Sequence, residues 1–286
     1  MIIRVELLGV QNEIFSRRNG DISSAICLKS SNGNKYFLKF NFDQKDEILF
    51  RGEFEGLRLM KETNSGLVIP EVFCYNKHAM LMEYLEFGKF SEEEFGVYLA
   101  NMHLSNRKSS NPVTQFGFHV TTCCGEMAYP NEWNLSWEDF YFDNRLKFVI
   151  ERINNKELFD LFEKLKNVKH QIFVGADPFP SLVHGDLWSG NYSGVGGKPA
   201  IYDPGAFYGD DEFEFGMIDL FGSVGDDFYK GYRSVIPERN GFNRRVKLYK
   251  LFHLLNHWAH FGSSYKNSSL SCIQNILQYT DDRQMQ

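Results

Sequence analysis

The first part of the chain alternates apolar and polar positions with the two-residue period of β-strands. Residues 21–30 and 35–40 are short alternating runs. The Asn-Gly pair within residues 31–34 separates them and is a strong signal for a β-hairpin. Residues 46–62 instead repeat apolar side chains at helical spacing. The apolar run at residues 79–85 then predicts a buried strand, so this part is expected to combine a small sheet with one helix.

Helical patterns dominate after Gly88, where the character of the sequence changes. The first of them opens with Ser91 and Glu94, the spacing of a capping box. Three segments carry helical patterns: residues 91–105, 136–167 and 243–260.

This order predicts an α+β protein with two lobes that join near residues 84–90. Residues 1–86 are expected to form a small N-lobe with an antiparallel sheet and one helix. Residues 87–286 are expected to form a larger, mostly helical C-lobe. This is the two-lobe organisation of a protein-kinase-like fold, and the chemistry-bearing residues described below support it.

Composition and charge exclude several classes of partner. The chain has 286 residues, of which 43% are apolar, and a net charge of −6. No basic stripe favours binding to nucleic acid, and no apolar run approaches the ~18 residues of a membrane-spanning helix. The N-terminus has no cleavable signal pattern. Five scattered cysteines without metal-ligand spacing are typical of reduced thiols, so we predict a cytoplasmic protein.

The stretch "SLVHGDLWSGN" at residues 181–191 carries the chemistry. Asp186 and Asn191 lie on a glycine-broken loop, and Asp203 follows a short apolar strand. Two carboxylates and an amide in this order fit magnesium-dependent phosphoryl transfer. Asp186 would accept the proton of the attacking hydroxyl, whereas Asn191 and Asp203 would supply oxygen ligands to Mg²⁺. The order is that of kinase catalytic loops, and Gly185 in place of their arginine indicates a small-molecule kinase.

The N-terminal part supplies candidates for binding ATP. Lys39, on the second hairpin strand, is placed to pair with the α- and β-phosphates, and Glu53, on the next helix, is placed to pair with Lys39. Residues 18–25, which include Gly20, would cover the phosphates. Taken alone, each of these residues has an ordinary structural explanation. Their joint order along the chain favours the interpretation as a kinase. The hinge residues that would meet the adenine are Glu83, Tyr84 and Leu85.

Longer strings resemble the fructosamine/ketosamine-3-kinase family from about Gly20 to about residue 277. They are "FGFHVTTCCGEM", "LVHGDLWSGN", "IYDPGAFYGDDEFEFGMIDLFG", "FYKGY" and "LYKLFHLLNHWAHFGSSYKNSSL". The resemblance implies a protein-kinase-like fold, ATP and Mg²⁺ as cofactors, and phosphorylation of the 3-hydroxyl of ketosamines, the adducts of sugars with amines. By motif it implies Asp186 as the catalytic base, Asn191 and Asp203 as metal ligands, and Lys39 with Glu53 on the phosphates.

The resemblance also suggests where the acceptor binds. Trp188, beside the base, is expected to stack on the sugar or amine, and Asn256 and His257 are expected to form an opposite wall. Alternatively, these two side chains tie helices together. His253, His257 and His260 share a helix face that could bind zinc, but no cysteine or carboxylate in the sequence evidently completes that set.

Two alternatives and one departure accompany this interpretation. An aminoglycoside- or choline-type phosphotransferase is the alternative enzyme; a pseudokinase would need the loss of Lys39, Asp186 or Asp203, which are all present. Asp21 stands where redox-switched family members carry a cysteine, so an N-lobe disulfide switch is not expected.

The expected partner is a small-molecule or protein-bound ketosamine, and the expected assembly is a monomer or weak homodimer.

Overall fold

The predicted hairpin is the centre of a five-stranded antiparallel sheet with strand order β1-β2-β3-β5-β4. A computed structural model describes residues 12–19, 24–41, 48–222 and 224–281. Gly33, in the turn between β2 and β3, has a φ of 90°, a conformation that glycine adopts without steric cost. The strands are β1 (Asn12–Asn19), β2 (Ser24–Ser30), β3 (Lys35–Phe40), β4 (Val72–Tyr75) and β5 (Ala79–Glu83).

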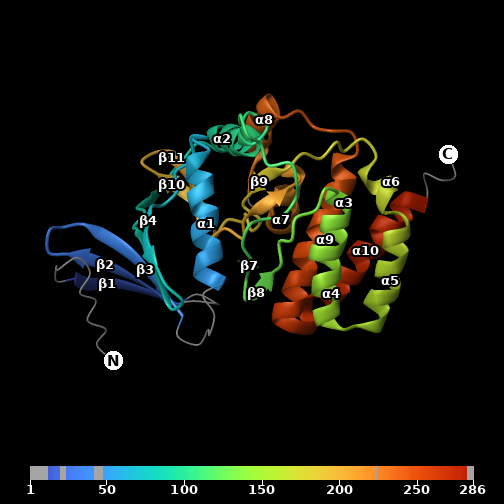
Figure 1. The fold of residues 1–286 in the computed structure, drawn as a ribbon, viewed down its shortest axis with the longest axis horizontal. Helices are drawn as coiled ribbons and strands as arrows, with labels where there is room; N and C mark the ends of the chain where they lie inside the picture. The colour runs from blue at the N-terminus through green and yellow to red at the C-terminus, as the bar shows by residue number, and fades with distance from the viewer. Residues whose placement is uncertain (1–11, 20–23, 42–47, 223, 282–286) are drawn as a thin grey trace.

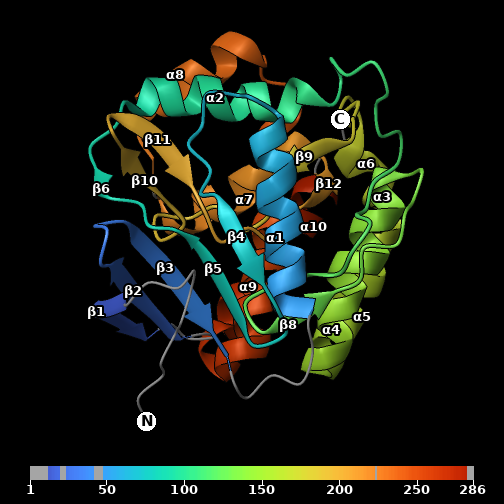
Figure 2. The ribbon, with the colours of Figure 1, turned by 60° about the vertical axis from the view of Figure 1, so that its left-hand side comes forward.

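Helix α1 (Ile48–Glu62) links this sheet to the rest of the protein. Its buried face includes Phe50, Leu57 and Met60, which belong to the main hydrophobic core. Figures 1 and 2 show α1 standing between the sheet and the helical body of the molecule. The helix predicted over residues 46–62 is therefore present, and it joins the core of the helical part to the sheet.

The first C-terminal helix, α2 (Glu92–Ser105), begins where the capping signal predicted. The Ser91 hydroxyl accepts a hydrogen bond from the backbone N–H of Glu94 at 3.3 Å. Helix α8 (Asp226–Val235) packs closely along it. A Cβ atom on Gly96 of α2 would lie 2.1 Å from the carbonyl oxygen of Phe228 in α8, so the two helices approach through a position that only glycine fits.

The helical pattern at residues 136–167 does not form one helix. It comprises α3 (Trp137–Asp139), the π-helix η1 (Phe140–Lys147), α4 (Phe148–Ile153) and α5 (Lys156–Asn167). The chain reverses at Asn154, which has a φ of 50°, and the side chain of Asn155 then caps α5 by accepting from the N–H of Leu158 at 3.0 Å. Asparagine suits both turns and helix caps, so the chain can reverse at these two residues. The apolar period continues on both sides of the reversal.

The central helix of the body, α9 (Phe242–Phe261), matches the pattern predicted at 243–260. Its buried residues lie on all sides, because the other C-terminal helices surround it. These are α6 (Lys169–Phe173), α7 (Glu214–Phe221) and α10 (Lys266–Asp281), with the short 3₁₀ turns η2 (Asp211–Phe213) and η3 (Gly262–Tyr265). Within the described ranges, no helix is both long enough and apolar enough to cross a bilayer.

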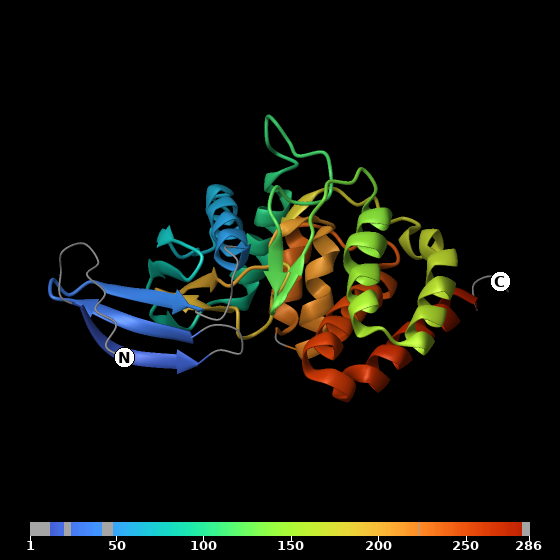
Figure 3. The same ribbon diagram turned by 60° about the horizontal axis from the view of Figure 1, so that its bottom comes forward.

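Short strands place the loops of the candidate site. They are β6 (Phe87–Gly88) with β10 (Tyr192–Val195) and β11 (Lys198–Ile201), β7 (Thr122–Cys124) with β8 (Met127–Tyr129), and β9 (Ser181–Val183) with β12 (Phe207–Gly209). The β7–β8 hairpin lies between α1 and the C-terminal helices (Figures 1 and 3). The α+β, protein-kinase-like architecture is confirmed; the lobe boundary at residue 86 stays a prediction.

Candidate active site

The catalytic-loop sequence follows β9 and turns sharply at Gly185, which has a φ of 82°. A Cβ atom there would lie 2.4 Å from the carbonyl oxygen of Gly205, so the loop passes directly against the segment after Asp203. This contact explains physically why a glycine stands where protein kinases carry arginine. The amide of Asn191 closes the loop by donating to the backbone oxygen of Asp186 at 2.8 Å and to its Oδ2 at 3.2 Å.

A buried carboxylate that the sequence analysis missed holds the loop from behind. Glu214, the first residue of α7, accepts hydrogen bonds from the backbone N–H of His184 at 2.6 Å and of Gly185 at 2.8 Å. The imidazole Nε2 of His184 in turn lies 2.9 Å from the carbonyl oxygen of Tyr202, the residue before Asp203. The sequence did contain a signal for this role. Glu214 ends an acidic run, and a carboxylate is rarely buried without a partner.

An ion-pair cluster lies between the sheet and the helical body, and it consists of Lys39, Glu53 and Asp203. The Lys39 ammonium donates to Glu53 Oε1 at 2.6 Å and also contacts Asp203 Oδ1. Burial alone would lower the pKa of Lys39, but the charges of Asp203 and Glu53 outweigh burial and raise it. Burial raises the pKa of Glu53 to about 7 against the opposing effect of Lys39. Lys39 is therefore a fixed positive charge held between two acidic side chains.

Asp186 is electrostatically unusual for an aspartate. Burial, followed by the negative charge of Asp203, raises its pKa to about 7. A carboxyl group with such a pKa is a stronger base near neutral pH than an exposed one, and this property suits proton abstraction from a hydroxyl.

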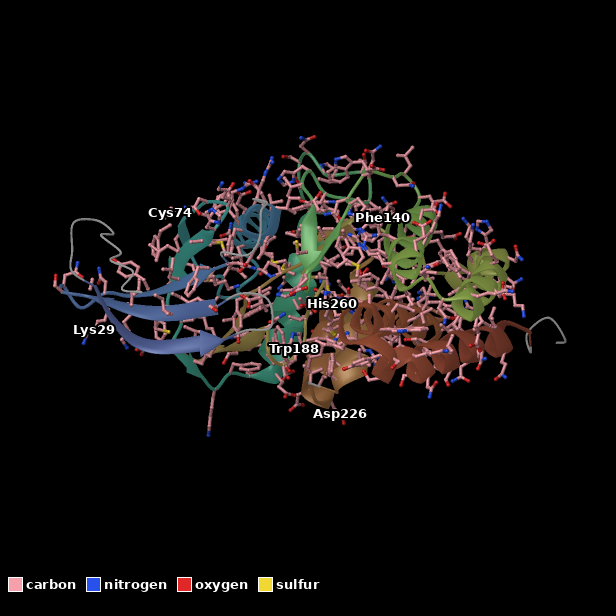
Figure 4. All side chains as sticks on the ribbon, turned by 90° about the horizontal axis from the view of Figure 1, so that it is seen from below. Lys29, Cys74, Phe140, Trp188, Asp226 and His260 are labelled. Carbon is pink, nitrogen blue, oxygen red and sulfur yellow. The ribbon has the colours of Figure 1, made fainter. Side chains whose placement is uncertain are left out.

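Most of the predicted site residues border one cavity of about 730 Å³. The predicted residues that line it are Lys39, Glu53, Asp186, Trp188, Asn191, Asp203, Asn256 and His257. Figure 4 shows Trp188 lying between the sheet and the helical body, with His260 nearby. A smaller cavity of about 410 Å³ is lined by residues of α1, β4 and the segment between them, and by none of the predicted residues.

One wall of the cavity is aromatic and includes residues that the sequence analysis missed. The ring of Trp188 lies 5.8 Å from that of Phe221, and Phe221 lies 5.4 Å from His257. Phe261 and Tyr265 extend this wall. Phe221, Phe261 and Tyr265 stand in the family strings quoted above. Nothing in those strings indicates that they line one site, because they come from the ends of α7 and α9 and from η3, which only the fold brings together.

Asn256 lines the cavity and also makes hydrogen bonds to buried neighbours. Its Oδ1 accepts from the Tyr129 hydroxyl at 2.8 Å, and its Nδ2 donates to the Cys124 sulfur at 3.2 Å. These bonds tie α9 to the β7–β8 hairpin and not to another helix. His257 Nδ1 donates to the backbone oxygen of His253 at 2.7 Å.

The sequence offered no cysteine or carboxylate to complete a site with His253, His257 and His260, and the structure brings such groups to His253 of these three. Candidate ligand atoms of Cys124, Asp186 and His253 all lie within 4.8 Å of one another. Sequence spacing could not show this cluster, because its three residues belong to β7, the catalytic loop and α9.

The three predicted hinge residues are not part of the cavity lining. Glu83 ends β5 and its backbone N–H donates to the carbonyl oxygen of Glu71 at 2.7 Å; Tyr84 and Leu85 connect it to β6. Gly20 lies outside the described residues, as does Asp21.

The sheet, α1 and the loops around Asp186 and Asp203 form a protein-kinase-like fold, and solved structures share it. A provisionally assigned fructosamine-3-kinase from Thermobifida fusca matches with a TM-score of 0.84 at 25% identity and covers 96% of both chains. An ADP-bound aminoglycoside phosphotransferase matches with a TM-score of 0.59 at 15% identity over 93% of both chains, a likeness of fold alone.

The sequence matches the fructosamine kinase family over residues 9–279, and the chain belongs to that family. It is 34% identical over 271 residues to the ketosamine-3-kinase of Mus musculus, covering 85% of this chain and 88% of the relative. It is 36% identical to the chloroplastic protein-ribulosamine 3-kinase of Oryza sativa subsp. indica, with coverages of 91% and 77%. The predicted family and the predicted enzyme class, a kinase, are confirmed, and membership implies the use of ATP.

Proposed function

We propose that this protein is an ATP-dependent kinase that phosphorylates the 3-hydroxyl of ketosamines and thereby starts their removal from amines. The observation that carries the proposal is the convergence of Lys39, Asp186, Asn191 and Asp203 on one cavity. The names of the mouse and rice relatives support ketosamines as the acceptor class.

In this mechanism Asp186 accepts the proton of the acceptor hydroxyl as oxygen attacks the γ-phosphate. Its raised pKa of about 7 makes it a competent base near neutral pH. Asn191, which holds the Asp186 carboxylate by a hydrogen bond of 3.2 Å, fixes the direction of that base. Lys39 pairs with phosphate oxygens and Glu53 keeps its ammonium in place.

Asn191 and Asp203 would hold Mg²⁺, which neutralises phosphate charge when bound. The donor set fits this ion, because amide and carboxylate oxygens are the hard ligands that it prefers. Asp203 has a φ of 62°, and its side chain contacts the Lys39 ammonium.

On the acceptor side, Trp188 and Phe221 offer a ring surface to the sugar and its amine. A secondary ammonium over an aromatic face gains about 0.5–2 kcal/mol. Once phosphate is on C3, loss of a proton from C1 gives the C1–C2 enaminol. Phosphate then leaves C3, and hydrolysis of the resulting C1 imine releases the free amine. Phosphorylation at C3 therefore labels the adduct for non-enzymatic breakdown.

The proposal extends to the setting of the reaction. The five cysteines are scattered along the sequence without metal-ligand spacing, which is typical of a reducing compartment such as the cytoplasm. The expected state is a monomer or weak homodimer, which size-exclusion chromatography with light scattering measures directly.

The test incubates the enzyme with Mg-ATP and a ribulosamine or fructosamine of lysine, and follows the reaction by ³¹P NMR and by release of free lysine. Asp186→Asn is the matched control. We expect a C3 phosphate, followed by amine release, only with the wild type. Transfer to an aminoglycoside or choline without transfer to any ketosamine would overturn the proposal, as would a stable phosphate on the terminal carbon of the sugar.

A further inference from the structure

His253 occupies an unusual position in the centre of the body. Its side chain is fully buried on α9, between the rings of Phe213 and Phe252. In the described part of the chain neither of its ring nitrogens has a hydrogen-bond partner. A buried polar atom without a partner destabilises the folded state, and both ring nitrogens of this imidazole are available to bind a ligand.

The unused imidazole faces two other ligating side chains. Cys124 ends β7 and Asp186 lies on the catalytic loop, and their ligand atoms lie within 4.8 Å of the histidine nitrogen and of each other. One sulfur, one nitrogen and one oxygen form a ligand set typical of zinc. Bond lengths of about 2.0–2.3 Å place tetrahedral ligands roughly 3.3–3.8 Å apart, so ligand atoms within 4.8 Å of one another need to approach by at most about 1.5 Å to share one ion.

We propose that Cys124, Asp186 and His253 form a Zn²⁺ site that inhibits the kinase when it is filled. The inhibition rests on the proposed function, because the ion would bind the carboxylate that accepts the hydroxyl proton. Cys124 and Asp186 also line the cavity, so the ion can enter from solvent and water can complete its coordination. The Cys124 sulfur bonds to zinc as its thiol proton passes to solvent, and binding therefore tightens as pH rises.

The other histidines of α9 are not equivalent to His253. His260 Nδ1 donates to the backbone oxygen of Asn256 at 2.7 Å, and its Nε2 accepts from the backbone N–H of Glu126 at 2.9 Å. Both of its ring nitrogens are therefore engaged. Cys123, the neighbour of Cys124, does not belong to the cluster of ligand atoms. These two residues, His260 and Cys123, supply matched controls.

The binding test uses Co²⁺ as a spectroscopic substitute for Zn²⁺ and needs no catalytic activity. Metal-free full-length protein is titrated with Co²⁺, and thiolate-to-cobalt charge transfer in the near ultraviolet and tetrahedral d–d bands in the visible are recorded. Competition with Zn²⁺ then gives its affinity. We expect both bands in the wild type and in Cys123→Ser and His260→Asn. Cys124→Ser should lose the charge-transfer band, and both Cys124→Ser and His253→Asn should weaken Zn²⁺ binding by more than about tenfold.

Circular dichroism of each variant establishes that it is folded; if His253→Asn does not fold, Cys124→Ser alone decides. A wild-type protein without a charge-transfer band, or equal zinc affinity in Cys124→Ser, would overturn the proposed site.

The inhibition test measures turnover in buffered Zn²⁺ at two Mg²⁺ concentrations. We expect inhibition of the wild type that excess Mg²⁺ does not relieve, and a more than about tenfold higher inhibitory concentration in Cys124→Ser. Inhibition relieved by Mg²⁺ and unchanged in Cys124→Ser would instead place the zinc on Asn191 and Asp203 and overturn the proposal. Cobalt bands without ketosamine turnover would leave the metal site standing while the proposed function fails.

Discussion

Replacing Asp186 by asparagine should abolish turnover and, at the same time, stabilise the folded protein at neutral pH. The amide keeps an oxygen that can accept the hydrogen bond from Asn191, but it carries no charge that folding must bury. In the wild type, burial and the charge of Asp203 raise the Asp186 pKa from 3.8 to about 7. The native state therefore binds the Asp186 proton more tightly than the unfolded state does.

The direction of this pKa shift determines how the stability of the folded protein changes with pH. Because the folded pKa is the higher one, the contribution of Asp186 to stability is complete below about pH 4 and is lost as pH rises through 7. At 1.36 kcal/mol per pKa unit the loss is at most roughly 4 kcal/mol. Asp186 is only half-buried and borders the cavity, so water solvates part of its charge and we expect about 2 kcal/mol.

The assay is thermal and urea unfolding of wild type and Asp186→Asn at pH 5 and pH 8, with chelator to remove metal ions. The advantage of the variant should grow by about 1–3 kcal/mol between the two pH values, at roughly 2–4 °C per kcal/mol. Asp160→Asn, an exposed aspartate on α5, is the control and should stay within about 0.5 kcal/mol. An Asp186→Asn variant that is less stable at pH 8, or whose advantage does not change with pH, would refute the reasoning.

Three further outcomes are expected. Lys39→Met should raise the KM for ATP by about tenfold or more, because the ammonium held at 2.6 Å by Glu53 is lost; an unchanged KM in steady-state kinetics would remove Lys39 from the phosphate site. Glu214→Gln should lower kcat by about 10–100-fold with little change in the KM for ATP, because glutamine can accept only one of the two N–H groups; kinetics and circular dichroism distinguish this from unfolding. Gly96→Ala should cost about 1–3 kcal/mol in urea unfolding, because its Cβ would lie 2.1 Å from a carbonyl oxygen, whereas Gly88→Ala, with its nearest neighbour at 4.0 Å, should be close to neutral.

The elements that the sequence predicted are those whose signals are local. The hairpin turn at residues 31–34, the cap at Ser91 and the long period of α9 each depend on neighbouring residues alone. The helical pattern at 136–167 is confirmed, but a hydrophobic repeat carries no information about a chain reversal, and only Asn154 and Asn155 mark the break.

The candidate site divides along the same line. Asp186, Asn191 and Asp203 follow a spacing that can be read from the sequence, and Lys39 with Glu53 follows from a strand-then-helix order. Glu214 was missed, although its two hydrogen bonds to the catalytic loop make it part of the same unit. The cluster at His253 was missed as well, because it depends on three distant segments meeting in space.

The contact between Lys39 and Asp203 has a consequence for the order in which ligands arrive. A divalent cation that binds Asp203 removes this carboxylate from the Lys39 ammonium. A triphosphate that binds Lys39 removes the ammonium from the Asp203 carboxylate. A cation alone therefore leaves Lys39 with Glu53 as its one remaining acidic partner, and a triphosphate alone leaves Asp203 without its ammonium partner, while the two ligands together compensate both groups. In the proposed reaction, Mg²⁺ and ATP should consequently bind with positive cooperativity, and loss of the metal after transfer should weaken the hold on ADP and so favour its release.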